Sequence, residues 1–248
     1  MIWVRRILFG AIALILVALL GFVAWATLGK QRPEALAQAA LDSPTNVTLE
    51  LNSGYALIPN TPAETGFIFY SGGLVTPEAY AAHLLPITQA GFTVFAPQMP
   101  LNLAVFNLNA AETIIEDNPQ IEYWVIGGHS LGGAMASQFT LNNDDEIDGL
   151  VLWASFPAES TDLSNHDITV SSIYGSLDGL ALGDEIGESA KLLPADTIFV
   201  EIVGGNHAQF GDYGPQGGDN EATISRQDQL AQAVEATLNL LQSVNNQQ

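Results

Sequence analysis

The sequence contains no cysteine among its 248 residues. This absence excludes disulfide bonds, thiolate metal sites, a cysteine nucleophile and a lipid-modified cysteine. Basic residues are also scarce, because six lysines and arginines stand against 27 aspartates and glutamates, for a formal net charge of −21. Beyond residue 32 only Lys191 and Arg226 are basic. We expect no nucleic-acid partner, because binding phosphates requires clustered positive charge.

Charge is also missing from a stretch near the N-terminus. Residues Ile7–Leu28 contain no charged side chain, and as a helix they would span about 33 Å, roughly the thickness of a bilayer's hydrocarbon core. Ala24-Trp25-Ala26 resembles a signal-peptidase cleavage site, so a membrane anchor and a removed export signal both stay open. The anchor is favoured because the apolar run exceeds that of usual signals. We expect residues 1–32 to form this segment, with the remainder membrane-anchored or secreted outside the cytoplasm.

Residues 33–248 alternate between strand and helix patterns without an internal repeat, so we expect one domain. Such alternation is typical of a mostly parallel sheet with helices on both faces. The expected strands are 46–51, 54–58, 66–70, 92–96, 121–126, 147–154, 168–175 and 197–203. The expected helices are 33–41, 77–90, 110–117, 134–141, 183–193 and 225–244.

The motif Gly127-Gly128-His129-Ser130-Leu131-Gly132-Gly133 joins an expected buried strand to an expected helix. A turn of this kind holds its central residue in a strained backbone conformation, and small neighbours let strand and helix approach closely. The Ser130 hydroxyl would then be exposed above the carboxyl end of the strand. The same G-x-S-x-G pattern also occurs where serine merely caps a helix, so the motif needs a base and an acid elsewhere in the chain.

These partners follow in order along the sequence. Asp178 comes just after expected strand 168–175, and His207 just after expected strand 197–203. On these residues the chain resembles the α/β-hydrolase fold family of serine hydrolases, from about Asn46 to the C-terminus, in a form without a lid. The resemblance implies a sheet of about seven or eight strands, with Ser130 as nucleophile, His207 as base and Asp178 as the acid that orients the imidazole.

The resemblance also implies an oxyanion hole built from backbone N–H groups. Leu131, at the start of the helix after Ser130, is one expected donor. The second would come from Gly73 or Leu74 in the turn after strand 66–70, and the sequence leaves that choice open. The family often has His-Gly here, and Tyr70-Ser71-Gly72-Gly73 departs from that pattern. No cofactor and no metal is expected.

Several residues have a simpler interpretation beside the catalytic one. Asp178 lies in the turn-forming sequence Ser176-Leu177-Asp178-Gly179, and Asp162 is a rival acid in the loop after strand 147–154. His129 is expected to pack away from the site, His83 to lie partly buried on a helix, and His166 to lie on a surface loop. The loop carboxylates could bind a cation, but a solvated loop is favoured; they are Asp212, Asp219 and Glu221.

The expected substrate is a small to medium hydrophobic ester. Only 13 residues separate Ala154 from Ile168, too few for a helical lid, so the site should be open. The apolar stretch Met99–Phe106, with Trp153 and Phe156, would either line an acyl pocket or pack beneath the serine turn. A thioesterase, a lipase, a peptidase and a non-catalytic binding protein of the same fold remain alternatives.

Overall fold

The structure is a computed structural model, and it describes residues 2–42 and 44–246. The chain divides into two compact units, Met1–Lys30 and Gln31–Gln248. Helix α1 (Ile2–Leu28) makes up the first unit. Within it, Phe9–Leu28 has a mean hydropathy of 2.6 and is long and apolar enough to cross a membrane, by length and composition. The expected N-terminal apolar helix is therefore present.

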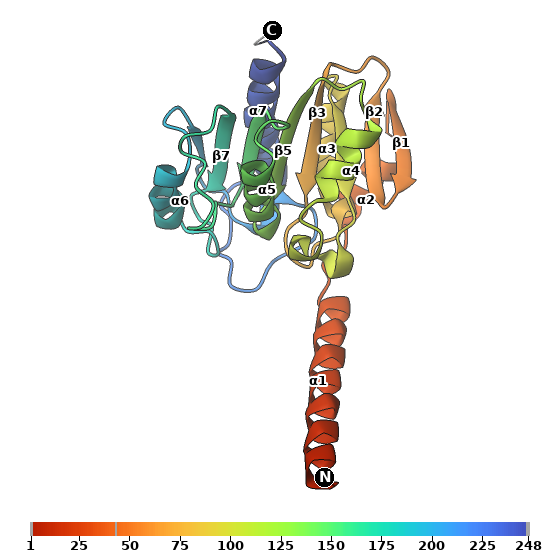
Figure 1. The fold of residues 1–248 in the computed structure, drawn as a ribbon. Coiled ribbons are helices and arrows are strands. Elements are labelled where there is room, and N and C mark those ends of the chain that lie inside the picture. Colours follow the sequence, from red (N-terminus) through yellow and green to blue (C-terminus); the bar gives the residue numbers. More distant parts are fainter. Residues whose placement is uncertain (1, 43, 247–248) are drawn as a thin grey trace. The chain divides into compact units, whose positions relative to one another are not determined.

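The second unit is built on one eight-stranded sheet with the strand order β1-β2-β4-β3-β5-β6-β7-β8 (Figure 1). Strand β2 is antiparallel to both β1 and β4, and the strands from β4 to β8 run parallel. This arrangement confirms the expected α/β-hydrolase fold. The strands are β1 (Val47–Asn52), β2 (Gly54–Pro59), β3 (Thr65–Tyr70), β4 (Thr93–Pro97), β5 (Tyr123–His129), β6 (Gly149–Trp153), β7 (Thr169–Gly175) and β8 (Ile198–Ile202).

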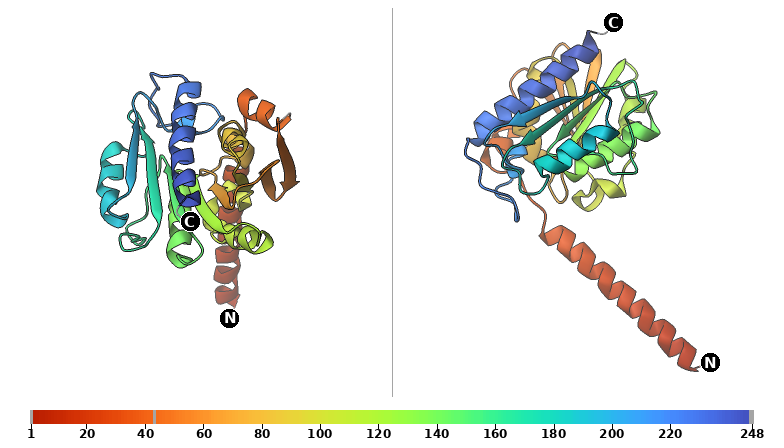
Figure 2. Two further views of the ribbon diagram at one scale, coloured as in Figure 1. Left: turned by 90° about the horizontal axis from the view of Figure 1, so that it is seen from above. Right: turned by 90° about the vertical axis from the view of Figure 1, so that its left-hand side faces the viewer.

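Helices cover both faces of the sheet (Figure 2). Successive residues of a strand point to opposite faces, so Phe67 and Phe69 of β3 enter one core while Ile68 and Tyr70 enter the other. The first core packs against α3 and α7, and the second against α4 and α5. The helices are α2 (Ala35–Asp42), α3 (Ala81–Gln89), α4 (Ala110–Asp117), α5 (Leu131–Asn142), α6 (Gly183–Ser189) and α7 (Arg226–Asn245).

Two regions differ from the expected elements. The helix expected over residues 77–90 is divided into a 3₁₀ turn, η1 (Pro77–Tyr80), and α3. The break falls at Tyr80, whose hydroxyl is engaged by groups on two other segments, and helical periodicity does not reveal such contacts. The apolar stretch Met99–Phe106, for which no helix was expected, contains two further 3₁₀ turns, η2 (Pro100–Asn102) and η3 (Ala104–Phe106).

The carboxyl ends of the parallel strands β3 to β8 meet at one side of the sheet, which we call the carboxyl edge. Backbone strain is concentrated in the loops that leave this edge. Five non-glycine residues there have φ between 45° and 62°, a region that residues with a side chain rarely adopt. Such strain tends to cluster at functional sites. The residues are Leu74, Leu101, Asn102, Ser130 and Ala154.

Candidate active site

Ser130 lies on a sharp turn between β5 and α5, with φ 53° and ψ −123°. A Cβ atom on Gly128 would lie 2.5 Å from the Gly132 carbonyl carbon, and one on Gly132 would lie 2.1 Å from the Tyr70 carbonyl oxygen. Only glycine fits at these two positions, because a Cβ atom would collide with neighbouring backbone atoms. The sequence motif predicts this close approach of strand and helix. The loop after β6 also holds the turn, because the Ser155 hydroxyl donates a 2.7 Å hydrogen bond to the Ser130 carbonyl oxygen.

His207 and Asp178 form a buried pair on the loops after β8 and β7. The distance from His207 Nδ1 to Asp178 Oδ2 is 2.8 Å, and both side chains are almost fully removed from solvent. The other carboxylate oxygen accepts the N–H groups of Leu180 at 2.8 Å and Ala181 at 2.7 Å. Because a carboxylate only accepts hydrogen bonds, Nδ1 is the donor, and Nε2 of a neutral His207 is the basic nitrogen.

The imidazole of His207 lies beside the serine turn. Its ring centroid is 4.5 Å from that of His129, the residue that precedes Ser130. His207 Nε2 is buried and has no hydrogen-bond partner within the described part of the chain. A hydrogen bond from the Ser130 hydroxyl to Nε2, which would let the imidazole take the hydroxyl proton, is therefore not formed in this structure. Catalytic hydrogen bonds are often long in the absence of substrate and tighten when it binds.

The expected oxyanion donors lie in the loop after β3 and at the start of α5. The N–H of Leu74 donates to the Asn102 carbonyl oxygen at 2.7 Å, so it is already occupied. The N–H of Gly73 has no hydrogen-bond partner among the described residues. A Cβ atom on Gly73 would lie 3.4 Å from Leu131 Cδ2, so this turn packs against the first residue of α5. Leu131 contributes an N–H group that has no partner inside its own helix.

A buried layer of aromatic and histidine side chains packs against His207 of the His207–Asp178 pair. His129 Nδ1 lies 2.9 Å from the Tyr80 hydroxyl, which also accepts the N–H of Gly72 at 3.0 Å. Burial, with the nearby His207 and His83, holds the pKa of His129 well below its usual range. A neutral His129 therefore adds no charge beside His207 near neutral pH. The packing role expected for His129 agrees with these contacts, but its ring packs against His207 and not away from the site, and the sequence did not indicate Tyr80.

The expectation that the loop carboxylates are solvated is wrong for Asp212 and Asp219, which accept hydrogen bonds from backbone N–H groups. Asp219 accepts the N–H groups of Gly179 at 3.1 Å, His207 at 3.2 Å and Ala208 at 2.8 Å. It therefore ties the loop that carries the acid to the loop that carries the histidine. Sequence reasoning missed this residue because no fixed spacing marks a carboxylate that binds backbone N–H groups from distant loops.

Asp212 is buried in the same loop, with only 3% of its surface exposed. Its Oδ2 accepts the N–H of Ala37 in α2 at 2.9 Å, and its Oδ1 lies 3.4 Å from Arg226 Nη1. Glu221 is exposed. No group of three or more potential metal ligands occurs among the described residues.

The remaining candidates lie outside the Asp178–His207 pair. The rival acid Asp162 is exposed, and its carboxylate accepts the N–H of Ser164. His166 pairs with Asp144 at 3.1 Å. His83 is completely buried rather than partly buried, and its Nε2 lies 3.1 Å from the Gln209 carbonyl oxygen. Burial lowers the pKa of His83 to about 4.

The apolar stretch 99–106 divides between both expected roles. Met99, Leu103 and Ala104 are buried, whereas Val105 and Phe106 are about half exposed at 49% and 52%. Trp153 is fully buried and donates to Thr237 Oγ1 at 3.0 Å, so it does not line a substrate pocket. Successive residues of β6 point to opposite faces of the sheet, and Trp153 lies on the face that α7 covers.

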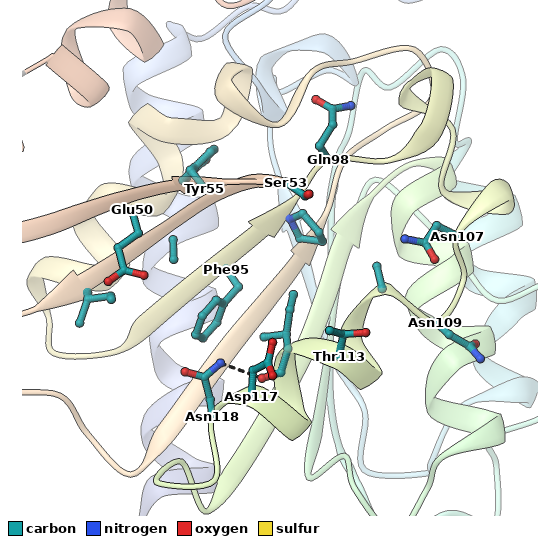
Figure 3. Close-up of a pocket in the computed structure, with 15 residues that line it drawn as sticks. Glu50, Ser53, Tyr55, Phe95, Gln98, Asn107, Asn109, Thr113, Asp117 and Asn118 are labelled. Atoms are coloured by element: carbon teal, nitrogen blue, oxygen red, sulfur yellow. Dashed lines mark hydrogen bonds between the residues drawn. The ribbon is translucent and has the colours of Figure 1, made fainter.

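A separate groove of about 590 Å³ lies over β1, β2, β4 and α4 (Figure 3). Its acidic side chains are Glu50 and Asp117, and Phe95 lies between them in the view of Figure 3. Neither Ser130, Asp178 nor His207 lines it. The groove does not belong to the cluster around Ser130.

A mostly parallel sheet of this order, with a strained serine after β5, defines the α/β-hydrolase fold class. Residues 66–231 match the Alpha/beta hydrolase family, and the chain belongs to this family. A comparison with curated proteins gives no match.

Solved structures show the same fold. A predicted CIB-like hydrolase from Thermoplasma acidophilum is 18% identical, with a TM-score of 0.59 over 78% of this chain and 100% of that chain. A monoacylglycerol lipase from Paleococcus ferrophilus is 16% identical, with a TM-score of 0.58 over 80% of this chain and 99% of that chain. At these identities the likeness establishes the fold and leaves the substrate open.

Proposed function

We propose that this protein is a serine hydrolase that cleaves carboxylic esters of small to medium hydrophobic substrates. The observation that carries the proposal is the buried 2.8 Å pair of His207 and Asp178 packed beside a strained Ser130 turn. A pair buried at this depth costs desolvation energy, which the two backbone N–H groups on Asp178 offset. Membership of a hydrolase family and the lipase and hydrolase neighbours support the same class.

The proposed reaction proceeds through an acyl-enzyme. Ser130 Oγ attacks the ester carbonyl carbon while His207 Nε2 takes the hydroxyl proton. The tetrahedral oxyanion is stabilised by the N–H groups of Leu131 and Gly73, each worth a few kcal/mol. We assign the second donor to Gly73 because the Leu74 N–H is occupied. The imidazolium then gives its proton to the leaving alkoxide. In the second half of the reaction, water attacks the acyl carbonyl carbon while His207 takes its proton. The imidazolium returns this proton to Ser130 Oγ as the carboxylic acid is released.

The N-terminal helix supports a location outside the cytoplasm. Within this proposal α1 is a membrane anchor or a signal, and the catalytic domain is membrane-anchored or secreted. The strongly acidic composition disfavours anionic substrates through like-charge repulsion.

A chain-length panel of nitrophenyl esters tests the proposal. We expect the full chain to hydrolyse short to medium acyl chains, and Ser130→Ala and His207→Ala to abolish this activity. A non-catalytic binding protein is the second candidate, favoured by the unpartnered Nε2 of His207. Folded wild-type protein without activity on any ester would support that alternative over ours, and unchanged rates in either variant would refute the assignment of Ser130 and His207.

A further inference from the structure

We propose that residues 31–37, the entry segment, position the oxyanion hole by holding the turn that carries Gly73. Within this segment, Gln31 is a positioning residue that acts through its main chain and touches neither the substrate nor the reacting atoms. The inference deepens the proposed function, and its statement about catalysis rests on that function. All the contacts that carry it lie within the second unit, Gln31–Gln248.

The turn after β3 contains a strained residue. The N–H of Val75 donates to the Gly72 carbonyl oxygen at 3.1 Å, which places Gly73 and Leu74 at the centre of a four-residue turn. Leu74 has φ 62°, a value that favours glycine or asparagine at this place in a turn. A residue with a side chain keeps such a conformation only when the surrounding structure holds it. The orientation of the Gly73 N–H, the proposed oxyanion donor, therefore depends on the groups that fix Leu74.

Two other segments hold the main chain of Leu74. Its N–H donates to the Asn102 carbonyl oxygen at 2.7 Å, and its carbonyl oxygen accepts the N–H of Gln31 at 2.7 Å. A second bond joins Gln31 to the turn, because the Gln31 carbonyl oxygen accepts the N–H of Thr76 at 3.1 Å. Asn102 is itself strained, with φ 55°, whereas Gln31 does not have a positive φ. Gln31 is therefore the unstrained support of the turn.

The entry segment is also bound to the loop that follows His207. The main-chain carbonyl oxygen of Asp212 accepts the N–H of Glu34 at 2.7 Å, and its carboxylate accepts the N–H of Ala37 at 2.9 Å. Ala37 is completely buried, and Asp212 is only 3% exposed. Glu34 follows Gln31 by three residues, so a short piece of chain joins the turn with the proposed oxyanion donor to the loop after the proposed base.

A proline at residue 31 tests this role, because proline has no N–H group but keeps its carbonyl group. We expect Gln31→Pro of the full chain to lower kcat on a soluble nitrophenyl ester about tenfold, with KM within twofold of wild type, since an oxyanion donor acts in the transition state. The control is Arg32→Pro, because the Arg32 N–H has no hydrogen-bond partner among the described residues. It should stay within twofold in both constants. An unchanged kcat in Gln31→Pro, or an equal loss in Gln31→Ala, which keeps both main-chain bonds, would overturn the proposal.

A second variant makes the test independent of how well Gln31→Pro folds. Thr76 has φ −74°, which suits proline, so Thr76→Pro removes the other hydrogen bond of Gln31 at little backbone strain. We expect kcat to decrease about threefold at unchanged KM. An increase in KM at unchanged kcat would contradict the inference, because it would show a contact with the substrate in its ground state.

The strain at Leu74 provides a test that separates positioning from general damage to the fold. Glycine adopts positive φ without a steric penalty, so with Leu74→Gly the turn depends less on Gln31. We expect Gln31→Pro to lower kcat by at most threefold when both chains compared carry Leu74→Gly. The same tenfold loss in both backgrounds would mean that the two residues act independently, and it would overturn the proposal.

Hydrogen exchange reports on the turn without any substrate. We expect the peptide covering residues 71–76 to exchange at least fivefold faster in Gln31→Pro than in wild type, with peptides from β5 unchanged. Unchanged exchange at residues 71–76 would show that Gln31 does not hold the turn. A wild type without ester hydrolysis would instead refute the proposed function and the catalytic part of this inference, while the exchange rates would still decide whether Gln31 holds the turn.

Discussion

The groove over β1, β2, β4 and α4 and the cluster around Ser130 both combine a serine, carboxylates and aromatic side chains, but only the cluster pairs a carboxylate with a histidine. In the groove, Ser53 and Asp117 lie with no histidine among the described lining residues (Figure 3). In the cluster, Asp178 is buried against His207, beside a serine with positive φ. The comparison teaches that a cavity need not contain the chain's buried, oriented titratable groups and strained residues, and it is these features on which the proposed function rests.

The largest difference in activity between changes in the cluster and changes in the groove should appear when the serine of each is removed. We expect Ser130→Ala to lower kcat/KM on the order of 10⁵-fold, because the remaining groups only bind and polarise the substrate. The matched change Ser53→Ala, in the groove, should stay within twofold of wild type. Steady-state hydrolysis of the preferred nitrophenyl ester measures both, and a large loss in Ser53→Ala would reverse the assignment.

Removing the negative charge beside His207 should have the next largest effect. We expect Asp178→Asn to reduce kcat about 10⁴-fold, since an amide that donates to Nδ1 would favour the wrong imidazole tautomer. Asp117→Asn in the groove should leave kcat unchanged. The pH–rate profile of each variant provides the measurement, and a wild-type profile in Asp178→Asn would show that this aspartate only forms its turn.

The buried layer beneath the cluster should make stability depend on pH. The pKa of His83 is about 4 in the folded protein and about 6.5 when unfolded, so between these values the unfolded chain binds more protons. Stability is therefore fully present above pH 6.5 and falls as the pH decreases toward 4. We expect His83 to account for a loss of about 2 kcal/mol between pH 7 and pH 5.

Urea unfolding of wild type and His83→Gln at the two pH values checks this contribution. The decrease in free energy of unfolding should be about 2 kcal/mol smaller in the variant. Ser53→Ala, which changes an exposed residue without a titratable side chain, should leave the wild-type pH dependence intact. Parallel losses in wild type and His83→Gln would mean that His83 is protonated in the folded state.

The smallest predicted effect is at Asp219, which touches backbone groups of both loops and no reacting atom. We expect Asp219→Asn to lower kcat about tenfold at unchanged KM, because it weakens the hydrogen bonds that position His207. Glu221→Gln, on an exposed neighbour, is the control. An equal increase in KM and no change in kcat would indicate a substrate contact in place of a positioning role.

The sequence predicts the fold well because central strands such as β3 are mostly apolar and the last helix has a clear start. Ser225, for example, was expected to begin the last helix, and its hydroxyl accepts the N–H of Asp228. The order of serine, aspartate and histidine along the strands also indicated which loops to compare. These patterns involve residues near one another in the chain or their order along it, so they can be recognised in a single sequence.

Other features depend on contacts between distant segments, which a single sequence does not express. Asp219 gains its partners only when the loops after β7 and β8 meet, and Tyr80 only when η1 lies beneath His129. The choice between Gly73 and Leu74 depends on Asn102, whose carbonyl oxygen occupies one of the two N–H groups. The sequence left open whether Trp153 lines a pocket or packs in the core, because the face on which a strand residue lies depends on the register of the sheet.

The account rests on Ser130 being a nucleophile activated by His207, and covalent labelling tests this most directly. Folded full-length protein is treated with a fluorophosphonate, and intact mass and peptide mapping locate the adduct, with Ser130→Ala and Ser53→Ala in parallel. We predict one adduct per chain on Ser130 in wild type and Ser53→Ala, and none in Ser130→Ala. An unmodified wild-type chain, or an adduct that persists in Ser130→Ala, would contradict the account.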